Sequence, residues 1–331
     1  MSPSSRRSAL KLGGALAAAS TFPALMTSAH AQSSWPSKPI RLVVPFAPGG
    51  SSEIVARSAA NELSKSLGQN VFVDNKPGAS GNIAMYECAN STDGHTLILG
   101  HIGTFAVNPF IFDKLPFDTY KDFQPISLLA KVPSLYVVNA DVPAKNLKEF
   151  IALAKSKPGK LNYGSAGNGS AGHLAFEYLK MVSNIFVLHV PYRGTGPQLT
   201  DLIAGRLDAA SVGAPAILAH IKSGKLRCIA TGTQERLPQL PDVPTVAESG
   251  YPGFEMTQWY GLNAPANMPS DAVAKLADAC AKAMKNPLAT ERLRGDTAQP
   301  VGDTPAQYGA FIKTEQARWK VVAARAKIKP D

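Results

Sequence analysis

Three short loops rich in glycine and serine carry the residues best suited to binding a ligand. They are Pro45-Phe46-Ala47-Pro48-Gly49-Gly50-Ser51-Ser52-Glu53, Asn75-Lys76-Pro77-Gly78-Ala79-Ser80-Gly81-Asn82 and Tyr163-Gly164-Ser165-Ala166-Gly167-Asn168-Gly169-Ser170. Each follows a strand-like apolar run and precedes a helical pattern, so it offers unpaired backbone N–H groups at the positive end of a helix dipole. Such helix starts attract anions, and glycine lets a ligand approach the backbone closely. We therefore predict one pocket for a small carboxylate, with Ser51 or Ser52 capping the helix after the first loop.

Hydrolysis is the competing use of the third loop. Asn168-Gly169-Ser170-Ala171-Gly172 resembles a nucleophile elbow, but Asn168 stands where the GxSxG motif needs a glycine. His173 is too close to Ser170 in sequence to be an obvious triad base. The sequence also has no HExxH motif and no P-loop lysine. We expect a binding protein that has no catalytic residue, no cofactor and no metal.

The elements around the loops form two α/β series. Strand and helix patterns alternate over residues 40–100 and again over 146–230, as they do in parallel sheets covered by helices. Extended stretches at 117–138 and 254–264 interrupt the alternation, and we interpret them as crossings between two lobes. Since ligands bind beyond the carboxyl ends of such strands, the first two loops should face the third across a cleft.

The C-terminal part has a helical pattern. We predict helices at 271–285 and 304–326, with Ser270 as the N-cap of the first.

Composition places the chain among globular proteins rather than disordered ones. It has 331 residues, of which 45% are hydrophobic and 18% charged, enough for two domains with their own cores. The net charge is +10, and Arg6, Arg7 and Lys11 supply three of these charges at the N-terminus. The remaining positive charge is dispersed, which favours mild steering of anions and argues against a nucleic-acid partner.

The N-terminus has the pattern of an export signal. Arg6-Arg7 and Lys11 precede an apolar run at 12–19 that is too short to span a bilayer, and Ala29-His30-Ala31 fits a small-x-small cleavage site. We expect residues 1–31 to be a signal peptide and the mature protein to be periplasmic.

The same segment bears on the cleavage site and on the export route. Cleavage is expected near Ala31/Gln32. The arginine pair resembles the twin-arginine motif, although Ala9 stands where an aromatic residue is usual, so both the Sec and the Tat routes remain open.

The three cysteines do not form a pattern typical of a disulfide-bonded scaffold or a zinc site. Cys88, Cys228 and Cys280 are odd in number, widely spaced and without a CxxC pair, so neither a disulfide scaffold nor a zinc site is indicated. We expect buried free thiols, and the sequence leaves the disulfide status open.

Four later motifs, together with the three loops, stand in the order found in one known family. They are Val190-Pro191-Tyr192-Arg193-Gly194-Thr195-Gly196-Pro197, His220-Ile221-Lys222-Ser223-Gly224-Lys225-Leu226-Arg227, Pro241-Asp242-Val243-Pro244-Thr245-Val246-Ala247-Glu248-Ser249-Gly250 and Trp259-Tyr260-Gly261-Leu262. With them, nearly the whole mature chain resembles the periplasmic solute receptors of tripartite tricarboxylate transporters, the Bug (Bordetella uptake gene) family.

The resemblance implies an α/β fold of the two-domain periplasmic-binding-protein kind (Venus flytrap, type II-like) with two crossover strands. Domain 1 would comprise residues 33–131 plus 258–331, and domain 2 residues 132–257.

The resemblance also implies a function. The protein would be a monomer that captures a small organic carboxylate, aromatic or aliphatic, and delivers it to tripartite tricarboxylate-type membrane subunits. A periplasmic protein that signals ligand occupancy to a membrane sensor is the alternative, because the fold does not separate delivery from sensing.

Site residues follow from the same resemblance. The first two loops would hold a carboxylate through backbone amides and ordered waters, and the third would close over it from the other lobe. We add Thr104 at a strand end, Arg193 as a clamp for a second carboxylate and Trp259 on the return crossing; Arg193 could instead anchor its own loop, and Trp259 could be core. The full predicted set is Phe46, Gly50, Ser51, Ser52, Glu53, Gly78, Ala79, Ser80, Gly81, Thr104, Ser165, Asn168, Gly169, Ser170, Arg193 and Trp259.

Two departures from the family pattern bear on the ligand. Glu53 stands where the family usually has Asp; it could contact the ligand or simply satisfy the helix dipole. Ser211-Val212 stands where the family often has Phe-Asp. The missing acid removes a partner for a ligand amino group, so we predict a plain or aromatic carboxylate rather than an amino acid.

Overall fold

The computed structural model describes residues 35–329, which lie within one compact unit. The predicted signal peptide lies outside the described residues. Among the helices that are described, none combines the length and the apolar character that a membrane span requires.

One mixed sheet connects the whole of this unit. Within residues 35–329 it contains ten strands in the order β2-β1-β3-β9-β4-β7-β5-β6, with β8 and β10 each paired to β4. The strands are β1 (Ile40–Val44), β2 (Val71–Asn75), β3 (Thr96–His101), β4 (Phe123–Asn139), β5 (Asn162–Ser165), β6 (Leu188–Pro191), β7 (Ala209–Gly213), β8 (Leu226–Thr231), β9 (Thr257–Pro265) and β10 (Gln299–Pro300).

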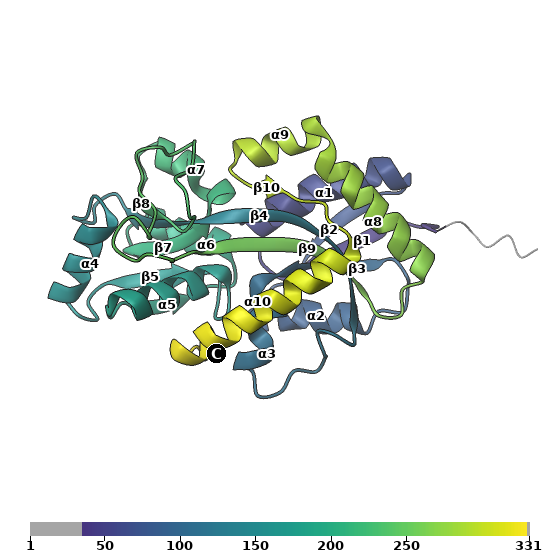
Figure 1. Cartoon of the computed structure of the whole chain (residues 1–331), viewed down its shortest axis with the longest axis horizontal. Coiled ribbons are helices and arrows are strands. Elements are labelled where there is room, and N and C mark those ends of the chain that lie inside the picture. The colour runs from purple at the N-terminus through teal and green to yellow at the C-terminus, as the bar shows by residue number, and fades with distance from the viewer. Residues whose placement is uncertain (1–34, 330–331) are drawn as a thin grey trace, which may run out of the picture. The chain divides into compact units, whose positions relative to one another are not determined.

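The two long strands β4 and β9 join two parallel groups. Strand β1 is parallel to β2 and β3, and β5 is parallel to β6 and β7. Strand β9 runs antiparallel to β3 and β4, while the far end of β4 runs antiparallel to β7 and β8. Figure 1 shows β4 and β9 side by side between the two groups. The predicted crossings are therefore strands of the sheet itself, which makes the sheet mixed rather than wholly parallel.

Helices pack on both groups of strands (Figure 1). They are α1 (Ser51–Leu67), α2 (Asn82–Ala89), α3 (Asn108–Ile111), α4 (Leu147–Ser156), α5 (Ala171–Ser183), α6 (Thr195–Ile203), α7 (Ala214–Lys222), α8 (Ser270–Lys285), α9 (Pro287–Gly295) and α10 (Pro305–Arg325), with a 3-10 turn η1 (Ala79–Gly81) and a π-helical turn η2 (Ile102–Val107). The sequence patterns did not predict η2, α3, α9 or β10.

Helix α1 shows how local sequence sets an element beside the site. Val55, Ala59 and Leu63 recur at helical spacing and are fully buried. Gly68, with φ of 67°, ends the helix in the left-handed conformation that glycine adopts without strain. At the other end the N-cap is Gly50, which has no side chain to cap with.

The two predicted caps are therefore wrong. Ser51 is the first residue of α1 rather than its cap, and Ser270 is the first residue of α8, whose N-cap is Pro269. In each case the cap lies one residue earlier than the serine, because the extended backbone ends there.

The central strands are buried on both faces. Leu42 and Val44 of β1 pack in one hydrophobic cluster, and Val43 packs in another on the opposite face. This double burial explains why these strands are continuous apolar runs.

All three cysteines are free and buried within the core. Burial raises the pKa of each thiol, Cys88, Cys228 and Cys280, to about 12. The structure shows the expected buried free thiols.

Candidate functional site

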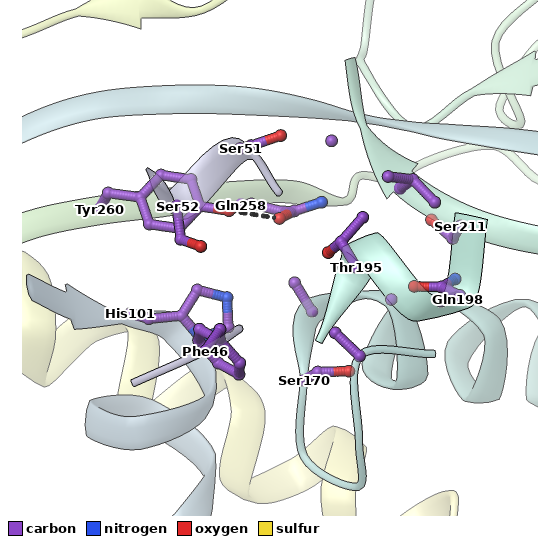
Figure 2. Close-up of a pocket in the computed structure, with 15 residues that line it drawn as sticks. Phe46, Ser51, Ser52, His101, Ser170, Thr195, Gln198, Ser211, Gln258 and Tyr260 are labelled. Carbon is purple, nitrogen blue, oxygen red and sulfur yellow. Dashed lines mark hydrogen bonds between the residues drawn. The ribbon is translucent and has the colours of Figure 1, made fainter. Parts of the chain in front are cut away.

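A small cavity lies where the first residues of four helices meet (Figure 2). Its volume of about 30 Å³ gives room for roughly two or three water-sized groups. It is lined by Phe46, Ser51, Ser52, His101, Ala166, Ser170, Ala171, Gly172, Thr195, Gln198, Ser211, Val212, Gly213, Gln258 and Tyr260.

The helix starts supply much of this lining. Ser51 and Ser52 open α1, Ala171 follows the N-cap of α5, Thr195 opens α6 and Gly213 is the N-cap of α7. Helices α1, α6 and α7 have no side chain bonded to their first amides. Because first-turn N–H groups have no intrahelical partner, this convergence favours a bound anion.

The described residues that line the cavity include no Asp, Glu, Lys or Arg. Burial lowers the pKa of His101 to about 3 and raises the pKa of Tyr260 above its ordinary value, so both are neutral at pH 7. The cavity therefore offers uncharged donors and helix dipoles to a ligand, and no side-chain counter-ion.

His101 is the most constrained of these donors. Its Nδ1 accepts the Gly103 amide at 2.9 Å, which places the proton of the neutral ring on Nε2. The ring packs edge-on against Phe46 and lies 5.5 Å from the Tyr260 ring, between centroids. The Nε2–H is thus a fixed donor in the cavity wall (Figure 2).

Three predicted residues of the first glycine loop, Phe46, Ser51 and Ser52, line the cavity. Glu53, also predicted, does not line it. Glu53 accepts the Gly49 amide at 2.7 Å and pairs with Arg57 at 2.6 Å. It therefore holds the loop in shape, which matches its interpretation as a first-turn acid.

The second glycine loop does not line the cavity and is held by a hydrogen bond from Asn108. The predicted residues Gly78, Ala79, Ser80 and Gly81 form the turn η1 and lie outside the cavity wall. The Ser80 carbonyl accepts from Asn108 Nδ2 at 3.0 Å. Any contact of this loop with a ligand remains a prediction.

The third loop is held by two buried histidines. The Gly169 amide donates to His173 Nδ1 at 3.0 Å, and Ser165 Oγ lies 2.6 Å from His189 Nε2. Ser170 caps α5 and lines the cavity, whereas Ser165, Asn168 and Gly169 do not line it. These contacts make His173 a buried, hydrogen-bonded part of the loop structure.

The remaining predicted site residues lie outside the cavity wall. The Arg193 side chain is exposed, and its carbonyl accepts the Ala47 amide at 3.3 Å. Thr104 is buried and donates to the His101 carbonyl at 3.1 Å. Trp259 is buried against α10, where its Nε1 donates to Glu315 at 2.9 Å. Their roles toward a ligand remain predictions, with local structural partners in each case.

Several polar or aromatic lining residues are absent from the predicted site set. They are His101, Thr195, Gln198, Ser211, Gln258 and Tyr260. For three of them the sequence pattern could have predicted a place in the site. His101 ends β3, and Gln258 and Tyr260 alternate with Trp259 along β9. Gln198, on the second turn of α6, has no such signal.

Loops from the two parallel groups meet closely around the cavity. A Cβ on Gly196 would lie 2.6 Å from the Pro48 carbonyl oxygen, and one on Gly103 would lie 2.3 Å from that of Gly169. Glycine therefore allows backbone segments far apart in sequence to touch beside the cavity.

Comparison with known proteins identifies the family. The family described as "Tripartite tricarboxylate transporter family receptor" (TctC) matches residues 55–327. The chain belongs to this family. Protein BugT of Bordetella pertussis is 35% identical over 287 residues, covering 86% of this chain and 88% of BugT.

Solved structures of relatives share the fold. Rpa4515 of R. palustris, solved with adipate, is 36% identical with a TM-score of 0.87 and covers 90% of this chain and 100% of its own. MatC of Rhodopseudomonas palustris, with bound malate, is 35% identical with a TM-score of 0.83, covering 87% and 99%. The periplasmic binding protein BugD is 33% identical with a TM-score of 0.86, covering 89% and 99%.

These matches confirm the predicted family and the α/β periplasmic-binding-protein fold. The TctC receptors are periplasmic solute-binding proteins rather than enzymes, and this chain is one of them.

Proposed function

We propose that this receptor captures a small organic carboxylate in the cavity where α1, α5, α6 and α7 begin, and delivers it to tripartite tricarboxylate-type membrane subunits. The observation that carries the proposal is the convergence of these helix starts on a cavity lined by neutral donors. Carboxylate oxygens accept hydrogen bonds from backbone amides and hydroxyls, and helix dipoles favour their charge.

Relatives support the ligand class. Rpa4515 was solved with adipate and MatC with malate, both of which are carboxylates. Since the cavity wall of this chain has no acidic side chain to pair with a ligand amino group, a plain carboxylate fits it better than an amino acid.

The proposal includes export and the two-domain division. The predicted signal peptide at 1–31 would direct the chain to the periplasm. Residues 33–131 plus 258–331 would act as one domain and 132–257 as the other, because β4 and β9 cross between the two parallel groups. Opening along these strands would admit the ligand.

A thermal-shift screen on the mature protein tests the binding step. Mono- and dicarboxylates, aspartate and glutamate are added at millimolar concentration, and the best acid is followed by titration calorimetry and recovered for NMR. We expect a higher Tm, since ligand at about 100 times Kd stabilises by about 2.7 kcal/mol, and an unchanged ligand. A screen in which no acid raises Tm, or in which only aspartate or glutamate does, contradicts the proposal.

Delivery needs a test in cells. A strain that lacks this receptor should lose uptake of the best acid and regain it when the receptor is restored. If uptake persists while a transcriptional response to the acid disappears, the protein signals rather than delivers.

A further inference from the structure

A second pocket lies in the segment that follows α3, and it shares no lining residue with the cavity at the helix starts. Its volume is about 310 Å³, at the lower end of the roughly 300–1,000 Å³ that small-molecule sites occupy. Most of its wall comes from α3 and the segment before β4, and Gln316 of α10 completes it. Figure 1 shows α3 beside α10.

Four aromatic side chains line this pocket: Phe110, Phe112, Phe117 and Tyr120. Phe117 is buried edge-on against Phe123, and Phe112 packs half-buried against the hydrophobic core. Phe110 and Tyr120 are 38% and 54% exposed. The pocket therefore has two rings anchored in the core and two rings that face solvent.

The exposed Tyr120 is fixed by a chain of hydrogen bonds. Its hydroxyl donates to Gln316 Oε1, and Gln316 Nε2 donates to the Phe105 carbonyl at 2.7 Å and contacts Thr119 Oγ1 at 3.4 Å. Gln316 itself is buried. Because the Tyr120 ring is held at its hydroxyl end, it forms a preorganised part of the wall, which lowers the entropy cost of binding.

The charge of the pocket is negative. Its described lining contains Asp113 and Asp118 and no lysine, arginine or histidine. The Tyr120 and Lys121 amides donate to Asp118 and lower its pKa, so this carboxylate is ionised at pH 7. Lys121 Nζ lies 3.9 Å from Asp118. The Asp113 carboxylate has no hydrogen bond or ion pair with any group of residues 35–329, so its charge is not compensated.

A cation already lies over one of these rings. Lys320 Nζ is 5.8 Å from the centroid of Phe110, within the roughly 6 Å over which a ring face attracts a positive charge. A metal ion fits the pocket less well, since no group of three or more metal-ligating side chains occurs among the described residues. Aromatic faces beside carboxylates are the chemistry that recognises quaternary ammonium groups.

We propose that this pocket binds a small organic cation of the quaternary ammonium class. The four aromatic rings contact its methyl groups, and Asp113 and Asp118 supply the counter-charge. The same two acids repel a phosphate, so the occupant is a free cation rather than a phosphocholine headgroup. This site is separate from the carboxylate cavity and does not depend on the proposed function.

The test compares choline with 3,3-dimethylbutan-1-ol, its uncharged isostere with carbon in place of nitrogen. Phosphocholine is the third probe. Each is titrated into the mature protein and followed by saturation-transfer NMR on its methyl signal. The variants are Phe110→Ala, Asp113→Asn and the control Phe72→Ala. Phe72 is an exposed aromatic residue on β2, outside the pocket.

We expect the wild type and Phe72→Ala to bind choline at least tenfold more tightly than the neutral isostere, and phosphocholine more weakly than choline. Phe110→Ala should weaken choline by about fivefold, because one ring face is lost. Asp113→Asn should weaken choline by about threefold, as expected for a solvent-exposed charge pair, and leave the neutral isostere unchanged. Addition of the best carboxylate should not displace choline.

Equal binding of choline and the neutral isostere by the wild type would overturn the proposal, and so would the absence of choline binding. Tighter binding of phosphocholine than of choline would contradict the free cation as occupant. Choline that the carboxylate displaces, or that Phe110→Ala binds as well as the wild type does, lies at another site. Each of these results leaves carboxylate capture untouched. Asp113→Asn keeps the variant test decisive even if Phe110→Ala does not fold.

Discussion

Neighbouring residues on a strand point to opposite faces, and this alternation decides which side chains can touch a ligand. On β9, Gln258 and Tyr260 line the cavity, and their hydrogen bond, 2.8 Å from hydroxyl to Oε1, is drawn in Figure 2. Trp259 between them packs edge-on against Phe311 on the other face. A large aromatic residue in a ligand-binding motif is therefore part of the core here.

Substitutions at Gln258 and Trp259, one on each face of β9, should affect different properties: ligand affinity and stability, respectively. Gln258→Leu is expected to weaken carboxylate binding by about fivefold, because the Tyr260 hydroxyl loses its acceptor, with a small effect on stability. Trp259→Phe should lower the free energy of unfolding by about 1–2 kcal/mol, because the Nε1–H bond to Glu315 is lost, and leave affinity unchanged. Calorimetry and urea unfolding measure the two effects. Loss of affinity in Trp259→Phe alone would reverse this assignment of faces.

Sequence reasoning found the residues whose signals are local. Strand ends, glycine loops and helix starts are encoded within a few residues, which is why Phe46, Ser51, Ser52 and Ser170 were predicted and lie in the cavity wall. Gln198 joins the wall only through the pairing of β4 with β7 and the packing of α6 on them. Such neighbours follow from long-range register, which no short motif contains.

At the scale of elements, the proposed recognition depends on where helices begin. Helices α1, α6 and α7 each follow a glycine N-cap, Gly50, Gly194 and Gly213, so no N-cap side chain bonds to their first amides. The same glycines allow close contact: a Cβ on Gly213 would lie 2.3 Å from Ser51 Oγ. Glycine at these positions thus leaves the first amides without a side-chain cap and allows close contact between neighbouring segments.

A methyl group at a contact between the two groups of loops should hold them apart. Gly196→Ala places a Cβ 2.6 Å from the Pro48 carbonyl oxygen. Because Gly196 does not have a positive φ, its own backbone should tolerate alanine. We expect carboxylate affinity to fall by about tenfold or more, with a change in unfolding free energy below about 1 kcal/mol. Titration calorimetry and small-angle scattering with and without ligand measure affinity and closure.

Gly295→Ala is the matched control, since a Cβ there meets nothing within 4 Å. It should bind and close like the wild type. An unaltered affinity in Gly196→Ala would show that the tight loop contact is not needed for binding.

At the scale of the whole molecule, stability depends on three histidines that stay neutral. Burial lowers the pKa of His101 and His189 to about 3 and that of His173 to about 4. Lys180 lowers the pKa of both His173 and His189 further, and Glu177 partly offsets this at His189. Since an unfolded histidine titrates near 6.5, the unfolded chain binds more protons below that pH.

The free energy of unfolding should therefore be highest above pH 6.5 and fall as pH decreases toward 4. Between pH 7 and pH 5 the expected loss is on the order of 1–2 kcal/mol per histidine. His173→Asn can keep an acceptor for the Gly169 amide and removes one of these protonation sites, so its pH dependence should be shallower. Urea unfolding at pH 7.5, 6 and 5 measures this. Identical pH profiles for the variant and the wild type would mean that His173 does not remain neutral in the fold.

The glycine-capped helix starts have a consequence for how such receptors diverge. Every residue except proline carries a main-chain N–H, so few point mutations would remove the amides that we propose bind the carboxylate. Side chains in the cavity wall, such as Ser211, can change without altering those amides. If the proposed function is right, single substitutions in the wall would change which acid binds while the amides keep the preference for a carboxylate.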